Sequence, residues 1–66
     1  MKAQVNGSFR ELAEGATVAS VVELLGIVTG GIAVALDDAV VPRSEWGSTP
    51  VLDGSRVEIL TATQGG

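Results

Sequence analysis

The side chains that most often carry covalent or acid–base chemistry are missing from this sequence. Its 66 residues include no cysteine and no histidine, so there is neither a thiol nucleophile nor an imidazole to move a proton. The serines and threonines therefore have no imidazole to activate them. The same absences remove the commonest zinc ligands, and we expect no metal site. These observations predict a protein that is not an enzyme.

Two short motifs within the chain could imitate a reactive site. Asp37-Asp38 is the only adjacent carboxylate pair, but neighbouring aspartates favour a solvated turn, and on a strand they would point to opposite faces. Gly30-Gly31 lacks the lysine and the following helix of a phosphate-binding loop. We interpret both motifs as connections between elements.

One chemical group remains, the C-terminal carboxylate of Gly66. Gly65 and Gly66 have no side chains, so such a tail could thread a cleft that any Cβ would block. A carboxylate becomes electrophilic only after one oxygen is converted into a leaving group, as an ATP-dependent partner does by adenylation. A terminal diglycine taken alone is also compatible with an ordinary frayed chain end.

The charge balance narrows the class of partner. Eight acidic residues against four basic ones give a net charge of −4, and the four cations are scattered. A nucleic acid or an anionic membrane requires clustered cations, so we expect neither as a partner. A positively charged protein surface fits better. The chain shows no signal-peptide pattern, and its most apolar run, Ile32 to Val41, contains two aspartates and is too short to span a bilayer. We expect a cytoplasmic protein.

Alternation and turn residues predict five strands and one helix. Asn6-Gly7, Asp37-Asp38 and Asp53-Gly54 are turn signals. Thr17 is a predicted N-cap, followed by an apolar stripe at Val18, Val21, Val22 and Leu25, with Gly26 as the stop. Residues 43–52 are predicted to be irregular, with one turn around residues 44–47. The predicted strands are 2–5, 8–12, 32–36, 39–41 and 56–61.

The order β-β-α-β-β-β predicts an α+β domain over residues 1–61, with a flexible tail over residues 62–66. One amphipathic helix can cover one face of such a sheet. The order resembles the β-grasp (ubiquitin-like) fold, which implies that the last strand lies parallel beside the first. Pro42 suits an edge position for the strand before it.

The last strand predicts a partner surface next to the tail. If Val57 and Ile59 face the core, then Glu58, Leu60 and Ala62 lie on the opposite face. Leu60 would then either form part of a partner-binding patch or be partly buried under a neighbouring side chain. The phase of Phe9 in its strand is left open.

Trp46 and Arg43 fall in the segment predicted to be irregular. We expect Trp46 to pack over the sheet edge, since a lone tryptophan in a small domain usually belongs to the core. We expect Arg43 to be held by an acidic neighbour.

Residues 35–46 read ALDDAVVPRSEW and are the most specific segment of the chain. Together with the turn at Val5-Asn6-Gly7, the helix start at residues 15–18, Asp53-Gly54, residues 57–59 and the terminal diglycine, this segment resembles the ThiS family. The members of that family are the ubiquitin-like sulfur carriers of thiazole formation in thiamin biosynthesis. Ser55 departs from the family, where an acidic residue often stands, and so does Gln64, where a small or apolar residue is common.

This resemblance implies a function for Gly66 and a set of partners. A ThiF-like adenylating enzyme, using ATP and Mg²⁺, would activate Gly66. A sulfur source such as a cysteine desulfurase would convert it into a thiocarboxylate, and thiazole synthase (ThiG) would accept the sulfur. The carrier itself would bind no cofactor.

Three alternatives remain open from the sequence. A carrier of another pathway, such as a MoaD-like molybdopterin carrier or one serving a cysteine or siderophore-type route, would use the same chemistry. A non-covalent ubiquitin-like module would not need its tail, and protein conjugation would use the tail differently.

Overall fold

A computed structural model describes residues 1–26 and 31–61 of the chain. The observed elements follow the predicted order, with a 3-10 helix added between the fourth and fifth strands. The second strand ends at Glu11, one residue earlier than predicted, although the buried Leu12 still exchanges backbone hydrogen bonds with Met1. The elements are β1 (Lys2–Val5), β2 (Ser8–Glu11), α1 (Val18–Leu24), β3 (Ile32–Leu36), β4 (Ala39–Val41), η1 (Arg43–Ser48) and β5 (Arg56–Thr61).

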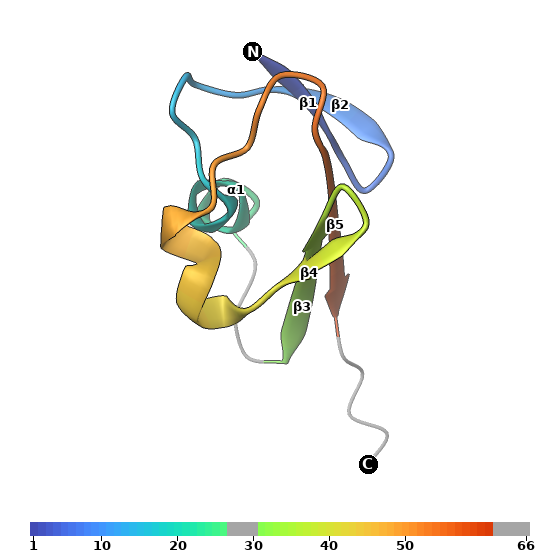
Figure 1. Cartoon of the computed structure of the whole chain (residues 1–66). Helices are drawn as coiled ribbons and strands as arrows, with labels where there is room; N and C mark the ends of the chain where they lie inside the picture. The colour runs from blue at the N-terminus through green and yellow to red at the C-terminus, as the bar shows by residue number, and fades with distance from the viewer. Residues whose placement is uncertain (27–30, 62–66) are drawn as a thin grey trace.

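The strands of the described residues form one mixed sheet in the order β2-β1-β5-β3-β4 (Figure 1). β5 lies in the centre, parallel to β1 and antiparallel to β3. This confirms the parallel pairing that the β-grasp resemblance implied. β4, which ends before Pro42, is an edge strand as predicted. Both two-residue turns, Asn6-Gly7 and Asp37-Asp38, have positive φ at each residue, as tight hairpins with a right-handed twist require.

Helix α1 begins as the sequence predicts. The Thr17 side chain accepts a hydrogen bond from the Ser20 amide, and the Ser20 hydroxyl accepts one from the Thr17 amide, which completes a capping box. Val18, Val21 and Val22 are buried, whereas Leu25 is the half-buried C-cap before Gly26, whose φ is +67°. A helix of 7 residues is too short to be stable alone, so its packing on the sheet holds it in place.

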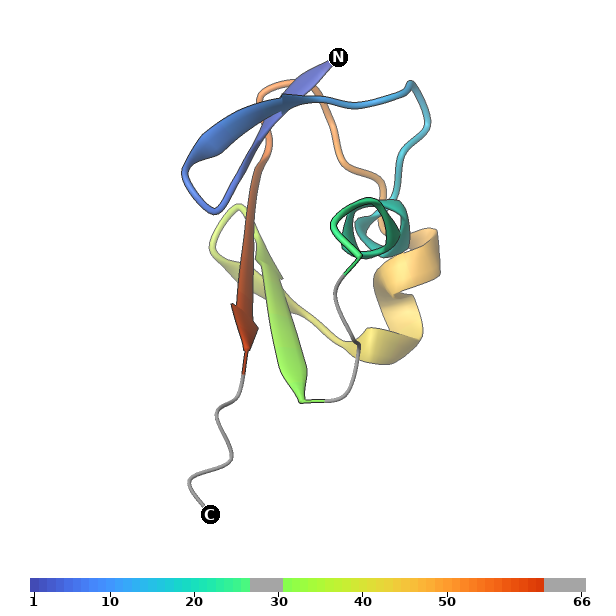
Figure 2. The ribbon, with the colours of Figure 1, turned by 180° about the vertical axis from the view of Figure 1, so that it is seen from behind.

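One face of the sheet, called here the inner face, is covered by α1 and η1 together (Figures 1 and 2). The two helices contact each other, and Trp46 from η1 is buried in the same core as the helix valines. The segment predicted to be irregular thus contains a 3-10 helix that closes one side of the core. The sheet residues of this core are Ala3, Val5, Val34, Val41, Val57 and Ile59.

Candidate functional site

Strand β5 presents opposite characters to the two faces of the sheet. Val57 is 0% exposed and Ile59 is 6% exposed, so both lie in the core as predicted. Glu58 and Leu60 alternate with them and are exposed, Leu60 at 66%. Of the two alternatives for Leu60, the structure supports exposure. The strand therefore carries core residues and a free apolar side chain side by side.

The strand register shows which residues share the uncovered face with Leu60. Leu60 lies beside Ala33, and Glu58 lies beside Ala35. Ala35 in turn lies beside Val40, which is 76% exposed. Residues paired across neighbouring strands point to the same face of a sheet. We call this group, residues 33, 35, 40, 58 and 60, the outer patch.

Phe9 belongs to the same face at the far edge of the sheet. Its register partner on β1 is Gln4, which in turn lies beside Arg56 of β5. Phe9 is exposed, so the outer face carries a large apolar side chain near each edge with polar side chains between them. The sequence left open which face of the sheet Phe9 takes, and the structure places it on the outer face.

Asn6 holds the strand that carries the outer patch, a contact that the sequence reasoning missed. Its amide nitrogen donates to the Ile59 carbonyl at 3.3 Å, and its side-chain oxygen accepts from the Ile59 amide at 2.7 Å. The backbone N–H of Asn6 also donates to the Val57 carbonyl at 2.9 Å. The side chain thus continues the ladder between β1 and β5 after β1 has ended. The Asn6-Gly7 motif predicts a turn because both residues tolerate positive φ, but the asparagine side chain can also pair with a peptide group.

Trp46 has the packing role predicted for it. It is buried, and its indole N–H donates to the Val41 carbonyl at the end of β4 at 2.9 Å. The prediction that an acidic neighbour holds Arg43 is wrong. The Arg43 guanidinium lies over the Trp46 ring, 5.4 Å from its centroid, and the ion pairs found within residues 1–26 and 31–61 use Met1 and Arg56 instead. A cation over an indole face is attracted by the quadrupole of the ring, which explains why Arg43 contacts Trp46 in place of an acidic residue.

The Asp37-Asp38 turn is confirmed, and both carboxylates have partners on β5. Asp37 accepts a hydrogen bond from the Arg56 amide at 2.9 Å, and Asp38 pairs with the Arg56 guanidinium. Ser55, the departure from the family pattern, is buried, and its hydroxyl accepts from the Leu52 amide at 3.0 Å. A serine therefore closes this turn without the cost of burying a charge.

The chain was compared with protein families and with solved structures. The ThiS family model matches residues 3–66. This chain belongs to the ThiS family. A crystal structure of a thiamine biosynthesis protein (ThiS) from Geobacter metallireducens is similar to it, with 30% sequence identity, a TM-score of 0.85 and full coverage of both chains. A solution structure of a thiamine biosynthesis protein from the same organism has 30% identity and a TM-score of 0.81, covering 100% of this chain and 88% of the other. No similar sequence was found among curated proteins.

Membership of the ThiS family confirms the resemblance and the β-grasp fold. Ala62, Gly65 and Gly66, which the sequence assigns to the tail and the partner surface, lie outside the described residues, as does Gly30. Their roles remain predictions. Glu58 and Leu60 lie together on the outer face, while whether they contact a partner also stays a prediction.

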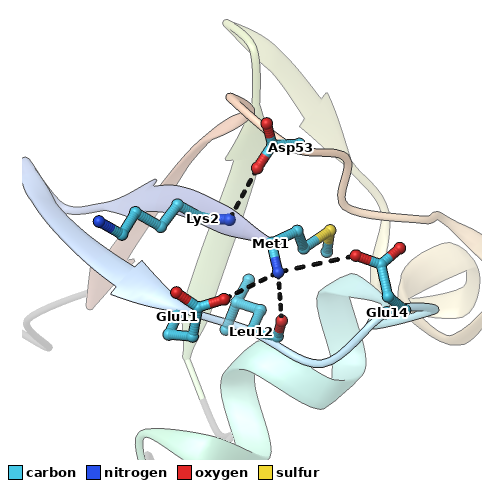
Figure 3. A network of polar contacts seen from close by, with 6 residues as sticks. All are labelled: Met1, Lys2, Glu11, Leu12, Glu14 and Asp53. Carbon is cyan, nitrogen blue, oxygen red and sulfur yellow. Dashed lines mark hydrogen bonds and ion pairs between the residues drawn. The ribbon is translucent and has the colours of Figure 1, made fainter.

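A polar network at the start of the ThiS-family domain ties β1 to its neighbours (Figure 3). The Met1 amine donates to the Glu11 carboxylate at 2.9 Å and to the Leu12 carbonyl at 3.1 Å, and Glu14 lies 3.6 Å away. The hydrogen bond to Glu11 raises the pKa of the amine, and the same bond lowers the pKa of Glu11. The Lys2 amide donates to Asp53 at 2.8 Å. This network secures the fold and lies away from the outer patch.

Neither a metal site nor a membrane span is found in the part of the chain that the structure describes. No group of three His, Cys, Asp or Glu residues there could hold a metal ion. No helix there is long and apolar enough to cross a membrane.

Proposed function

We propose that this chain is a sulfur carrier of thiamin biosynthesis and that Gly66 carries the sulfur. The observation that carries the proposal is the family match, which runs through Gly66 and so includes the terminal diglycine. The similar protein from Geobacter metallireducens, described as a thiamine biosynthesis protein, supports the pathway. We assign no reaction to the chain alone, since its sequence lacks cysteine and histidine.

The proposed chemistry takes place at the Gly66 carboxylate. A ThiF-like adenylating enzyme binds ATP and Mg²⁺, joins AMP to a carboxylate oxygen and releases pyrophosphate. The outer sulfur of a donor persulfide, such as that of a cysteine desulfurase, then displaces AMP to form an acyl disulfide, and a thiol reduces this disulfide to release the Gly66 thiocarboxylate. Sulfide would displace AMP and give the thiocarboxylate in one step. Thiazole synthase (ThiG) accepts that sulfur. Gly65 and Gly66 enter the partner's cleft because they have no Cβ.

The outer patch is the proposed docking surface for these partners. Leu60 is exposed only one residue before the end of β5, so a protein that grips the outer patch also reaches the tail that follows. Glu58 adds a negative charge to the patch, which favours a basic partner surface. Ala62 would extend the same alternation by one more position.

The test is intact mass after incubation with ATP, Mg²⁺, a ThiF-like enzyme and a sulfide source. We expect the mass gain of one oxygen replaced by sulfur. The same chain lacking Gly66 is the matched control and should show no gain. If an enzyme that loads another ThiS protein leaves this chain unchanged, the carrier proposal is wrong for that partner class. A gain that persists without Gly66 would place the sulfur elsewhere.

A further inference from the structure

A groove lies between the end of β2 and helix α1, away from the outer patch. It has a volume of roughly 320 Å³ and is lined by residues 11–16 with Ser20 and Leu24. Leu12 and Ala16 in its lining are buried, and Leu24 at its helical side is 58% exposed. The groove thus has buried apolar residues in its lining and an exposed leucine at its helical side. The chemistry proposed at Gly66 does not involve this groove.

The strand beside this groove has a free edge. β2 is the last strand of the sheet on its side. The Met1 amine and Leu12 carbonyl bond each other, as do the Leu12 amide and Met1 carbonyl. Hydrogen-bonded pairs alternate along an antiparallel ladder, so Arg10 bonds to β1 while the backbone groups of Phe9 and Glu11 point away from it. An extended chain could pair with these outward groups.

Charge and face define what such a chain must contain. Glu11 is paired with Lys2 in the register, so a residue added opposite Glu11 would point to the outer face, where a basic side chain suits it. Its neighbours would point to the inner face, toward the groove and Leu24, where apolar side chains suit the lining. Glu14, which also lines the groove, is exposed and lies 3.6 Å from the Met1 amine that Glu11 also binds, so two carboxylates share one amine at this end of β2. The matching sequence alternates basic and apolar residues.

We propose that β2 and the groove beside α1 form a docking site for an extended segment of a partner protein, with alternating basic and apolar residues, that joins the sheet as an additional strand. This site goes beyond the carrier function. β1 and β5 separate β2 from the strands that complete the outer patch, so both surfaces can be occupied at once.

The first test uses a short capped peptide that alternates lysine and valine, titrated into the ¹⁵N-labelled full chain. We expect amide shifts around residues 9–16, Ser20 and Leu24, and slower hydrogen exchange at Phe9 and Glu11 but not at Arg10. A matched peptide with glutamate in place of lysine should not bind. The site is refuted if the lysine peptide causes no shifts at roughly 1 mM, or if the shifts fall on the outer patch instead.

Leu24→Lys tests the groove with little risk to folding, because Leu24 is exposed at the end of α1. We expect it to weaken peptide binding about tenfold, and Glu14→Gln about threefold, as exposed charge pairs contribute modestly. Leu52→Lys is the matched control, since Leu52 is 64% exposed and does not line the groove. It should bind as the unchanged chain does. Equal affinity of Leu24→Lys and Leu52→Lys would overturn the proposal.

The carrier assay separates this site from the proposed function. Leu24→Lys should gain sulfur at the same rate as the unchanged chain, because the tail and the outer patch are intact. If Leu24→Lys loses both peptide binding and sulfur loading, the groove belongs to the adenylating enzyme's interface, and the separate site is refuted. If the unchanged chain binds the peptide but is never loaded, the carrier proposal fails while the docking site stands.

Discussion

Ile59 and Leu60 are neighbours on β5 and isomers of each other, but they lie on opposite faces of the sheet. Ile59 is 6% exposed beneath the helices, and Leu60 is 66% exposed on the outer patch. Burying a side chain of this size stabilises a domain by roughly 1.5–3 kcal/mol, and Leu60 contributes little of that. The stability of the fold therefore accounts for an apolar side chain at Ile59 but not for one at Leu60. An apolar side chain that the fold does not require is typical of a binding residue.

The two faces of the sheet also differ in what covers them. The inner face is covered by α1 and η1 (Figure 2). The outer face carries exposed side chains from Phe9 near one edge to Val40 at the other. Successive residues of a strand point to opposite faces of the sheet, so the same strands can supply both the core and a binding surface. In a chain of this size, few elements can be reserved for binding alone.

Ile59→Ala should produce the largest effect. Removing buried methylene groups from a core leaves a cavity, and we expect a loss of about 3 kcal/mol in the free energy of unfolding. This is a large share of a small domain's stability. Urea denaturation followed by far-UV circular dichroism measures it. At temperatures where the variant is folded, its affinity for the adenylating enzyme should be unchanged, and a stability loss below about 1 kcal/mol would contradict the assignment of Ile59 to the core.

Asn6→Gly tests whether both faces of β5 depend on the asparagine contact. Glycine keeps the positive φ of 50° accessible but loses both hydrogen bonds to Ile59, and we expect a loss of about 2 kcal/mol. Hydrogen exchange at the Ile59 amide should accelerate. Asn6→Asp keeps the acceptor for that amide and should protect it better than Asn6→Gly. If the Ile59 amide exchanges at an unchanged rate in Asn6→Gly, the contact does not hold the strand.

The parts of the fold that the sequence predicts are those fixed by local chemistry. Asn6-Gly7 and Asp37-Asp38 turn the chain because their residues tolerate positive φ, and Thr17 caps α1 through residues three positions away. The face of Leu60 followed from alternation once Val57 was assigned to the core.

Contacts between distant residues could not be predicted in the same way. The bond between Asn6 and Ile59 joins residues 53 positions apart, and it exists only because β5 lies parallel to β1. The 3-10 helix forms where Trp46 reaches the Val41 carbonyl and the core beside α1, a tertiary condition that no local propensity encodes. The partners of Arg43 and Ser55, by contrast, lie only three positions away along the chain, at Trp46 and Leu52. The sequence shows these neighbours but not the local backbone geometry that brings their groups into contact. The role of Gly66 rests on family membership, since alternation and turn signals do not reach it.

Leu60→Ala should reverse the pattern expected for Ile59→Ala. The free energy of unfolding should change by less than about 0.5 kcal/mol, because the side chain is mostly exposed. Affinity for the adenylating enzyme, measured by calorimetry, should fall about tenfold if Leu60 is an anchor of the outer patch. Val40→Ala, on the same patch but farther from the tail, is the matched comparison and should weaken binding less. Unchanged affinity of Leu60→Ala for both the adenylating enzyme and thiazole synthase would refute the proposed docking surface.

The smallest effect is expected at β2, where the contrast between the faces is lost because all four residues are exposed. The hydrogen bond between Glu11 and the Met1 amine raises the pKa of the amine and lowers that of Glu11. The stabilisation is therefore lost as pH rises through the raised pKa of the amine, and lost again as pH falls through the lowered pKa of Glu11. In Glu11→Gln, the urea midpoint should lie slightly below that of the unchanged chain near neutral pH, and the two should converge at both extremes. Glu58→Gln, on the outer patch, is the control. A difference between Glu11→Gln and the unchanged chain that is constant at all pH values would show that Glu11 acts through packing and not through this ion pair.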